Sequence, residues 1–186
     1  ELGVSMEQAR DALVSFSGVP GRFQSVDQGQ EFAVIVDYAH SPDSLANVLA
    51  TARGITDGQV ICVFGCGGNR DKGKRKYMGK AASDIADFCV EMADYSIVTS
   101  DNPRSEDPAS IAREVSAGMG ANNGRWAVIL DRAEAIHEAI GRARPGDLVL
   151  IAGKGHETYQ VFADRTVDFD DVQVAQAVLK ELIPGA

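Results

Sequence analysis

Short apolar runs alternate with segments of helical periodicity along most of the chain. The runs are rich in Val, Ile and Leu, and polar residues stand at their ends and not at every second position. Strands with this pattern are buried on both faces, as in parallel sheets that are covered by helices. The predicted strands are 32–37, 60–64, 95–99, 126–130 and 148–152.

Helix start signals lie between these strands. Ser41 and Asp107 each precede a proline, which is favoured in the first helical turn, and Asp131 begins a D-x-x-E cap. A hairpin is expected at 159–162 and 166–169, before a closing helix that ends at 182. This alternation predicts right-handed βαβ crossovers. We therefore expect an α/β fold with three layers, a mostly parallel sheet of about six strands and an antiparallel C-terminal hairpin.

The first 24 residues differ from the rest. Ser5 and Gln8 have the spacing of a capping box, and Met6, Ala9 and Leu13 recur at helical intervals. The sequence Ser-Gly-Val-Pro-Gly at 17–21 then breaks the helical pattern. It predicts a separate helix followed by a hinge or linker.

Composition narrows the class of protein. The 186 residues are 45% hydrophobic and 24% charged, which fits a soluble domain, or one domain with a remnant of another. The net charge of -9 argues against a general nucleic-acid binder, although the basic cluster 70–80 can bind a small anion. No apolar stretch approaches the roughly 20 residues of a membrane span, and no signal peptide is expected.

The three cysteines do not form a metal-binding pattern. Cys62 and Cys66 are spaced C-x3-C without a second cysteine pair or a nearby histidine, and Cys89 completes an odd number. Zinc sites need a fuller set of ligands. We expect free, buried thiols in a reducing compartment and no metal site.

Polar, glycine-bearing loops follow four of the predicted strands. They span 37–43, 65–75, 100–104 and 153–157. Ligands of open parallel sheets bind outside the carboxyl ends of the strands, so these loops predict a binding site at one edge. Each loop alone also has an ordinary interpretation: Asp37 as a turn residue, His40 as a solvated histidine, and 72–76 as a solvated helix start.

The chemistry of these loops suits an amino-acid ligand. Asp101 and Arg104 offer a carboxylate for an ammonium and a guanidinium for a carboxylate, three residues apart. Glu157 can hold a second ammonium, Gly153 offers a backbone carbonyl, and Arg70 can bind an anion. No G-x-x-x-x-G-K-[ST] motif is present, and 65–68 departs from G-x-G-x-x-G. As an independent catalyst, the chain is incomplete.

Taken together, the four loops resemble the C-terminal domain of the Mur ligase family. The matching motifs are Asp-Tyr-Ala-His-Ser-Pro-Asp at 37–43, Gly-Cys-Gly-Gly-Asn-Arg-Asp-Lys-Gly-Lys-Arg at 65–75, Asp-Asn-Pro-Arg at 101–104 and Gly-Lys-Gly-His-Glu at 153–157. The resemblance implies a three-domain cytoplasmic enzyme whose Rossmann-like last domain brings the amino acid. It implies that residues 1–21 are a remnant of the central ATP-binding domain and that 22–186 form the C-terminal domain. We expect such a fragment to be inactive alone.

The resemblance also implies a substrate and site residues. The enzyme would use ATP and Mg²⁺, bound mainly by the central domain, to add meso-diaminopimelate to a UDP-N-acetylmuramoyl dipeptide in peptidoglycan synthesis. The implied nucleotide-binding residues are Arg22, Asp37 and His40. The implied amino-acid-binding residues are Arg70, Asp101, Asn102, Pro103, Arg104, Gly153 and Glu157.

The predicted choice of amino acid depends on two arginines. Diaminopimelate is lysine with an added distal carboxylate, which Arg70 and Arg104 can neutralise, and burying it unpaired would cost several kcal/mol. Lysine-adding relatives depart from Asp-Asn-Pro-Arg at this place. A ligase that adds L-lysine and a non-catalytic binding module that reuses the lobe are the alternatives. One departure from the family pattern is a longer interval before Asp101, with 88–94 as the expected insertion.

Overall fold

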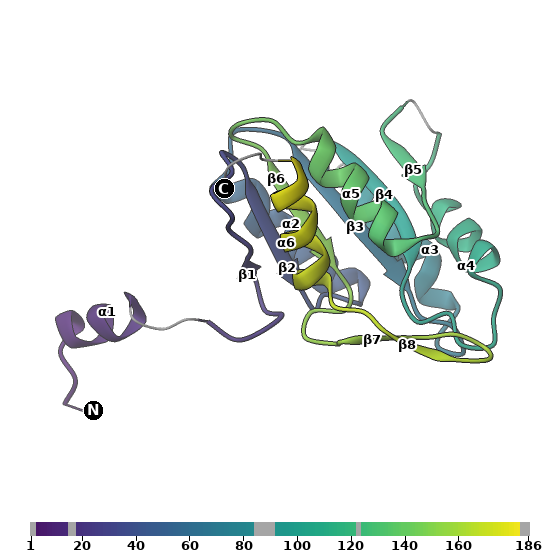
Figure 1. Cartoon of the computed structure of the whole chain (residues 1–186), viewed down its shortest axis with the longest axis horizontal. Helices are drawn as coiled ribbons and strands as arrows, with labels where there is room; N and C mark the ends of the chain where they lie inside the picture. The colour runs from purple at the N-terminus through teal and green to yellow at the C-terminus, as the bar shows by residue number, and fades with distance from the viewer. Residues whose placement is uncertain (1–2, 15–17, 84–91, 122–123, 183–186) are drawn as a thin grey trace.

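Helices and strands alternate along the chain in the computed structural model, which describes residues 3–14, 18–83, 92–121 and 124–182 (Figure 1). The helices are α1 (Met6–Val14), α2 (Pro42–Ile55), α3 (Gly73–Ser83), α4 (Pro108–Ser116), α5 (Arg132–Arg142) and α6 (Asp171–Leu182). The strands are β1 (Gln24–Ser25), β2 (Ala33–Asp37), β3 (Val60–Cys66), β4 (Tyr95–Ser100), β5 (Trp126–Val128), β6 (Leu148–Ala152), β7 (Tyr159–Val161) and β8 (Thr166–Asp168).

The central sheet has the order β1-β2-β6-β3-β4-β5. Strands β2 to β6 run parallel, and only β1 is antiparallel to its neighbour. Strand β6 lies between β2 and β3, and Leu148 is in register with Ala33 on one side and Val60 on the other. The chain therefore reverses its direction of travel across the sheet when it enters β6. A reversal of this kind separates the loops at the carboxyl ends and leaves room for a ligand.

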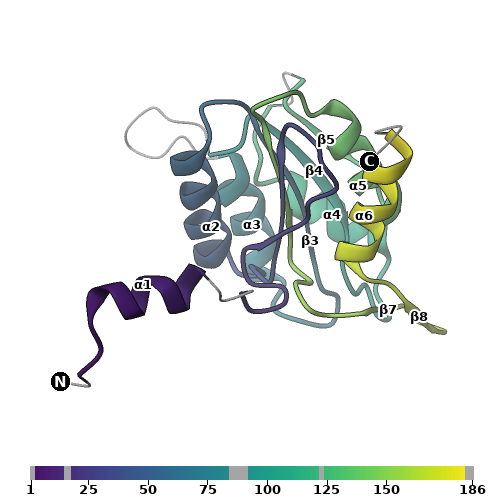
Figure 2. The same ribbon diagram turned by 60° about the vertical axis from the view of Figure 1, so that its left-hand side comes forward.

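Helices cover both faces of the sheet. Helices α2, α3 and α4 pack on one face, where their apolar side chains meet Ile35, Cys62 and Phe64. Helices α5 and α6 pack on the other face, where Val34 and Val63 point. Figure 2 shows α2 and α3 on one side of the strands and α5 and α6 on the other. The three-layer α/β fold is confirmed, and the strands are apolar throughout because both of their faces are buried.

The predicted helix caps are confirmed. Ser41 accepts a hydrogen bond from the Ser44 amide in a capping box, and Asp131 accepts one from the Glu134 amide. Asp107 accepts hydrogen bonds from two amides in the first turn of α4. These side chains satisfy amide groups that the first turn of a helix leaves without partners.

The strand boundaries differ from the predictions at a few positions. Strand β3 continues to Cys66, and β5 ends at Val128, although the Ile129 amide still donates to the Val98 carbonyl at 3.0 Å. The hairpin β7–β8 forms as predicted and is a separate two-stranded sheet. Strand β1 is an addition that no local pattern predicted. Cys89, whose thiol was predicted to be free and buried, lies outside the described residues, as does most of the expected insertion 88–94.

Helix α1 lies apart from the sheet in Figures 1 and 2. Its capping box forms, since the Gln8 amide donates to Ser5 Oγ at 3.1 Å and the Ser5 amide donates to Gln8 Oε1 at 2.9 Å. Met6 is 87% exposed. Within the described residues, no helix combines the length and the apolar character that a membrane crossing needs.

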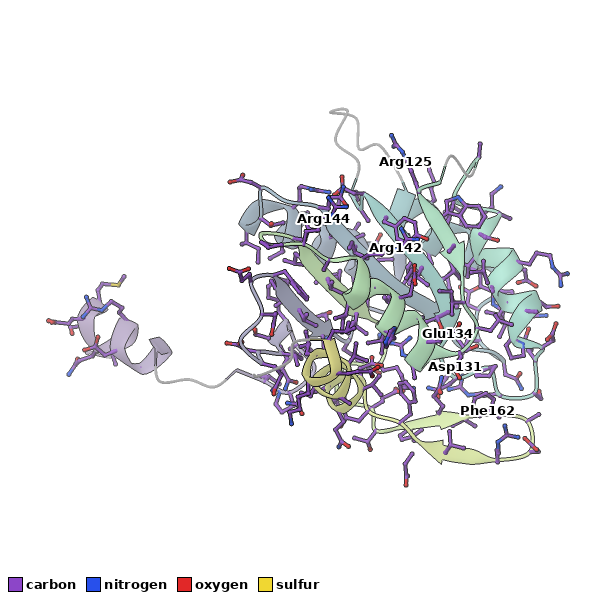
Figure 3. All side chains as sticks on the ribbon, turned by 45° about the horizontal axis from the view of Figure 1, so that its top comes forward. Arg125, Asp131, Glu134, Arg142, Arg144 and Phe162 are labelled. Carbon is purple, nitrogen blue, oxygen red and sulfur yellow. The ribbon has the colours of Figure 1, made fainter. Side chains whose placement is uncertain are left out.

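The two ends of the parallel strands form a carboxyl edge and an amino edge of the sheet, and these carry different segments. Figure 3 shows Asp131 near the hairpin residue Phe162 at one edge, and Arg125 and Arg144 toward the other. The first edge holds the carboxyl ends of the parallel strands, where the polar loops of the sequence gather. The second holds the amino ends.

Candidate functional site

A cavity of about 350 Å³ opens at the carboxyl edge of the sheet. Its walls come from the end of β3 and from the segments that follow β2, β3, β4 and β6, which together are the four loops predicted from the sequence. The lining residues are Tyr38, His40, Gly65, Cys66, Gly67, Arg70, Asp71, Lys74, Asp101, Asn102, Arg104, Gly153 and Glu157. The structure thus brings six of the seven predicted amino-acid-binding residues to one cavity.

The seventh residue, Pro103, has a different place. It is buried and does not line the cavity. A Cβ atom added at Gly68 would lie 1.9 Å from the Pro103 carbonyl oxygen. Glycine at 68 therefore allows the loop after β3 to pass directly against the loop after β4, which brings Arg70 and Arg104 to the same cavity.

Arg104 is held in an unusual backbone conformation. Its φ is +53°, in the left-handed region that non-glycine residues rarely adopt. Its Nη1 donates to the Gly68 carbonyl at 2.8 Å and to the Asn102 carbonyl at 3.3 Å, and its amide donates to the Val161 carbonyl at 2.9 Å. These bonds hold the guanidinium at the cavity wall, while Arg70 is exposed at the rim. A strained residue in a cavity wall is a common feature of ligand sites.

Carboxylates lie on another part of the wall. Asp101 Oδ1 and Glu157 Oε2 are 3.4 Å and 3.5 Å from Lys154 Nζ. Asn102 Nδ2 donates to Glu157 Oε2 at 2.9 Å. The cavity therefore offers guanidinium groups for a carboxylate and carboxylates for an ammonium.

The three predicted nucleotide-binding residues gather beside this cavity. His40 lines it, and its ring lies 4.6 Å from the Tyr38 ring. The Arg22 guanidinium is 4.7 Å from the Tyr38 ring centroid, a cation–π distance. Asp37 accepts hydrogen bonds from the Phe23 amide at 2.7 Å and the Ala39 amide at 2.8 Å. Arg22 and Asp37 are therefore neighbours of the cavity and not part of its lining.

The predicted hinge is fastened to the loop after β6. Gly21 is buried with a φ of +68°, and a Cβ atom there would lie 2.1 Å from the His156 amide nitrogen. The His156 ring lies 5.1 Å from the Tyr38 ring. Glycine at 21 lets the segment before β1 reach the 153–157 loop. This contact links the predicted nucleotide-binding residues to the predicted amino-acid-binding residues.

Two buried arginines support the edge and were not predicted from the sequence. Arg132 is 1% exposed and forms two 2.7 Å hydrogen bonds to Asp171, and its Nη2 donates to the Ala152 carbonyl at 3.0 Å. It thereby joins α5 and α6 to the end of β6. The available signal was position: 132 falls on the same helical face as the buried 135, 136, 139 and 140.

Arg75 was interpreted as part of a solvated helix start, and this is wrong. The residue is fully buried, and its guanidinium pairs with Glu106 and Glu114, each at 2.8 Å. The hydrogen bonds from Arg75 and from the Asn69 amide lower the pKa of Glu106 to about 2. Arg75 shares a helical face with the buried Met78, which is why a charged side chain is turned inward there.

The cysteines are buried thiols, as predicted for Cys62 and Cys66. Burial raises the pKa of each to about 12, so both are protonated at neutral pH. Cys66 also lines the cavity. Among the described residues, no group of three His, Cys, Asp or Glu side chains could hold a metal ion.

Comparisons with known proteins show what the chain is similar to. The family model described as Mur ligase, glutamate ligase domain, matches residues 21–155. UDP-N-acetylmuramoyl-L-alanyl-D-glutamate–2,6-diaminopimelate ligases of Syntrophomonas wolfei and Geobacillus thermodenitrificans are each 53% identical over 179 residues, 96% of this chain and 35% of theirs. A solved structure with that protein name has a TM-score of 0.79 at 39% identity, over 97% of this chain and 35% of that one. The chain spans about a third of the length of these relatives.

Proposed function

Because the chain belongs to the Mur ligase family, we propose that it is the amino-acid-binding lobe of an ATP-dependent ligase. The complete enzyme would add meso-2,6-diaminopimelate to UDP-N-acetylmuramoyl-L-alanyl-D-glutamate in cytoplasmic peptidoglycan synthesis. The lobe would be inactive alone, because its sequence has no P-loop. Residues 1–21 would belong to the central domain, and 22–186 to the lobe.

The observation that carries this proposal is the distribution of charge in the cavity. The cavity wall contains the positively charged Arg70 and Arg104 as well as the negatively charged Asp101 and Glu157. Diaminopimelate has an ammonium and a carboxylate at each end. One end can therefore pair with both the guanidinium groups and the carboxylates of the wall. The distal end of L-lysine has an ammonium but no carboxylate, so it would leave the two guanidinium groups without a partner where the bound ligand excludes water, which is costly.

The neighbouring edge would face the nucleotide. Arg22 and His40 are exposed there, and both lie against the Tyr38 ring. Asp37 ties the segment before β1 to the end of β2 through two backbone amides. This support would hold Arg22 where it can approach a phosphate when the lobe closes on the central domain.

The role of the lobe in the reaction would be alignment. ATP would convert the γ-carboxylate of the D-glutamate into an acyl phosphate, which the amine of diaminopimelate attacks, and phosphate leaves. The residues described here would fix the far end of the diamino acid, so that its near amine meets the acyl carbon. Such positioning replaces a bimolecular encounter and supplies a large part of the rate enhancement.

A domain exchange tests the proposal. Residues 22–186 would replace the corresponding domain of the Geobacillus thermodenitrificans relative, and peptide-bond formation would be measured with meso-diaminopimelate and with L-lysine. We expect activity with a preference for diaminopimelate of about 100-fold, equivalent to about 2.7 kcal/mol. Faster addition of L-lysine would assign the chain to a lysine ligase. A folded but inactive exchange protein would favour the non-catalytic binding module.

A further inference from the structure

Lys154 is buried behind the wall of the cavity and does not line the cavity itself. None of its surface is exposed. It stands between Gly153 and Gly155, whose φ angles of +116° and +54° lie in the region that side chains disfavour. The two glycines allow the turn after β6 to direct this lysine inward, where a buried ammonium is costly unless it is paired.

The Lys154 ammonium joins two loops. Its Nζ lies 3.3 Å from Asn102 Oδ1, 3.4 Å from Asp101 Oδ1 and 3.5 Å from Glu157 Oε2. Asp101 and Asn102 follow β4, whereas Glu157 follows β6. An ammonium is a compact charge with three donors, so it can bridge three oxygens from different directions.

Two of these side chains, Asn102 and Glu157, are also bonded to each other. Asn102 Oδ1 also accepts from the Val161 amide at 3.0 Å, and Asn102 Nδ2 donates to Glu157 Oε2 at 2.9 Å. The orientation of the amide is fixed by these partners. Lys154 therefore belongs to a network whose members set one another's positions.

The network has one unbalanced charge. Two carboxylates face one ammonium, which leaves one net negative charge. The side chains of Asp101 and Glu157 remain 13% and 21% exposed, whereas Lys154 approaches them from the buried side. Their remaining oxygen surface lies toward the cavity, where a second ammonium can bind.

We propose that Lys154 is a positioning residue, which orients Asp101, Asn102 and Glu157 to receive the ammonium at one end of a diamino diacid. This inference rests on the proposed function. It assigns discrimination for the ammonium to a lysine that touches no ligand, while Arg70 and Arg104 bind the carboxylate. Without Lys154, the two carboxylates repel each other and move apart.

Two ligands separate this role from general support of the fold. Diaminopimelate carries ammonium and carboxylate groups, whereas pimelate has the same carbon chain and carboxylates but no ammonium. NMR titrations of the chain with each ligand would compare the wild type with Lys154→Met and Lys154→Gln. Lys180→Met, which changes an exposed lysine of α6, is the matched control. Urea unfolding would report the stability of each variant.

We expect both Lys154 variants to bind diaminopimelate about tenfold or more weakly and pimelate less than about twofold differently, with the control unchanged. Equal weakening of both ligands, or unchanged binding of diaminopimelate, would overturn the inference. Loss of folding in both Lys154 variants would also overturn it, because the lysine would then maintain the fold. If the wild type does not bind diaminopimelate, the proposed function itself fails.

Discussion

The two edges of the central sheet contain the same kinds of charged residue and use them differently. At the amino edge, Asp147 accepts hydrogen bonds from the Gln59 and Arg144 amides at 2.8 and 2.9 Å. Asp94 accepts one from the Val60 amide at 2.7 Å. These carboxylates close the ends of strands through backbone amides, and Asp94 also pairs with the Arg53 guanidinium.

At the carboxyl edge, the carboxylates of Asp101 and Glu157 are held by the side chain of Lys154 and face a cavity. Asp37 differs from these two carboxylates, because it lies at the carboxyl edge but accepts hydrogen bonds from two backbone amides. A carboxylate that backbone donors satisfy has little capacity for a ligand. One that is held by a side chain and partly exposed retains that capacity, which locates the site at the carboxyl edge.

The largest effect should come from the ion pair beneath the carboxyl edge. Replacing Arg132 by Met leaves Asp171 buried without its partner, and we expect the free energy of unfolding to fall by about 3–5 kcal/mol. Urea unfolding would measure this loss. Arg165→Met is the control, because its pair with Asp164 is exposed and should contribute less than about 1 kcal/mol.

A double variant separates charge burial from loss of packing. Arg132→Met combined with Asp171→Leu removes both charges, and most of the stability should return because no uncompensated carboxylate remains. If the double variant is as unstable as Arg132→Met alone, the hydrogen bond from Arg132 to the Ala152 carbonyl carries the effect, and not the ion pair.

The fold was predictable because its signals are local. Continuous apolar runs mark the buried strands, and Ser41, Asp107 and Asp131 mark helix starts within a few residues of the turns they cap. Strand β1 has only two residues and forms through pairing with β2, so no periodicity identifies it. The position of β6 between β2 and β3 is likewise set by packing between distant segments.

The site was predictable in part for a related reason. Residues that follow parallel strands must meet at one edge, so Asp101 and Glu157 could be brought together from their positions alone. The supporting charges could not, because Arg132 lies 39 residues from Asp171 and Arg75 lies 31 residues from Glu106. A charged residue on the apolar face of a helix signals burial but does not identify its partner.

A matched pair of substitutions at the two edges gives the next largest effect. Asp147→Asn places an amide donor against a backbone amide, and we expect a loss of about 1–3 kcal/mol of stability, with diaminopimelate binding unchanged. Asp101→Asn should cost less than about 1 kcal/mol of stability, since Lys154 keeps Glu157 as a charged partner, but weaken diaminopimelate binding about tenfold. Urea unfolding and NMR titration would measure both quantities.

The outcome of that pair decides whether the contrast between the edges is real. If Asp147→Asn weakens diaminopimelate binding as much as Asp101→Asn does, the two edges are coupled, and the division between strand closure and ligand binding is wrong. Equal losses of stability in the two variants would indicate that Asp101 also closes a strand end.

The smallest effect is a dependence on pH at the carboxyl edge. Hydrogen bonds from Arg75 and the Asn69 amide lower the pKa of Glu106 from 4.5 to about 2. Because the folded state lowers this pKa, the stability that Glu106 contributes is fully present above about pH 4.5 and is lost as the pH falls toward 2. The stability difference between the wild type and Glu106→Gln should therefore be largest at neutral pH and shrink below pH 4.5.

Urea unfolding at a series of pH values would measure this difference. Glu31→Gln, an exposed position near the amino edge, is the control and should follow the wild type at every pH. A difference between the wild type and Glu106→Gln that stays constant from pH 7 to pH 2 would show that the glutamate stabilises the protein by shape and not by charge. The carboxyl edge would then differ from the amino edge through Lys154 and Arg132 alone.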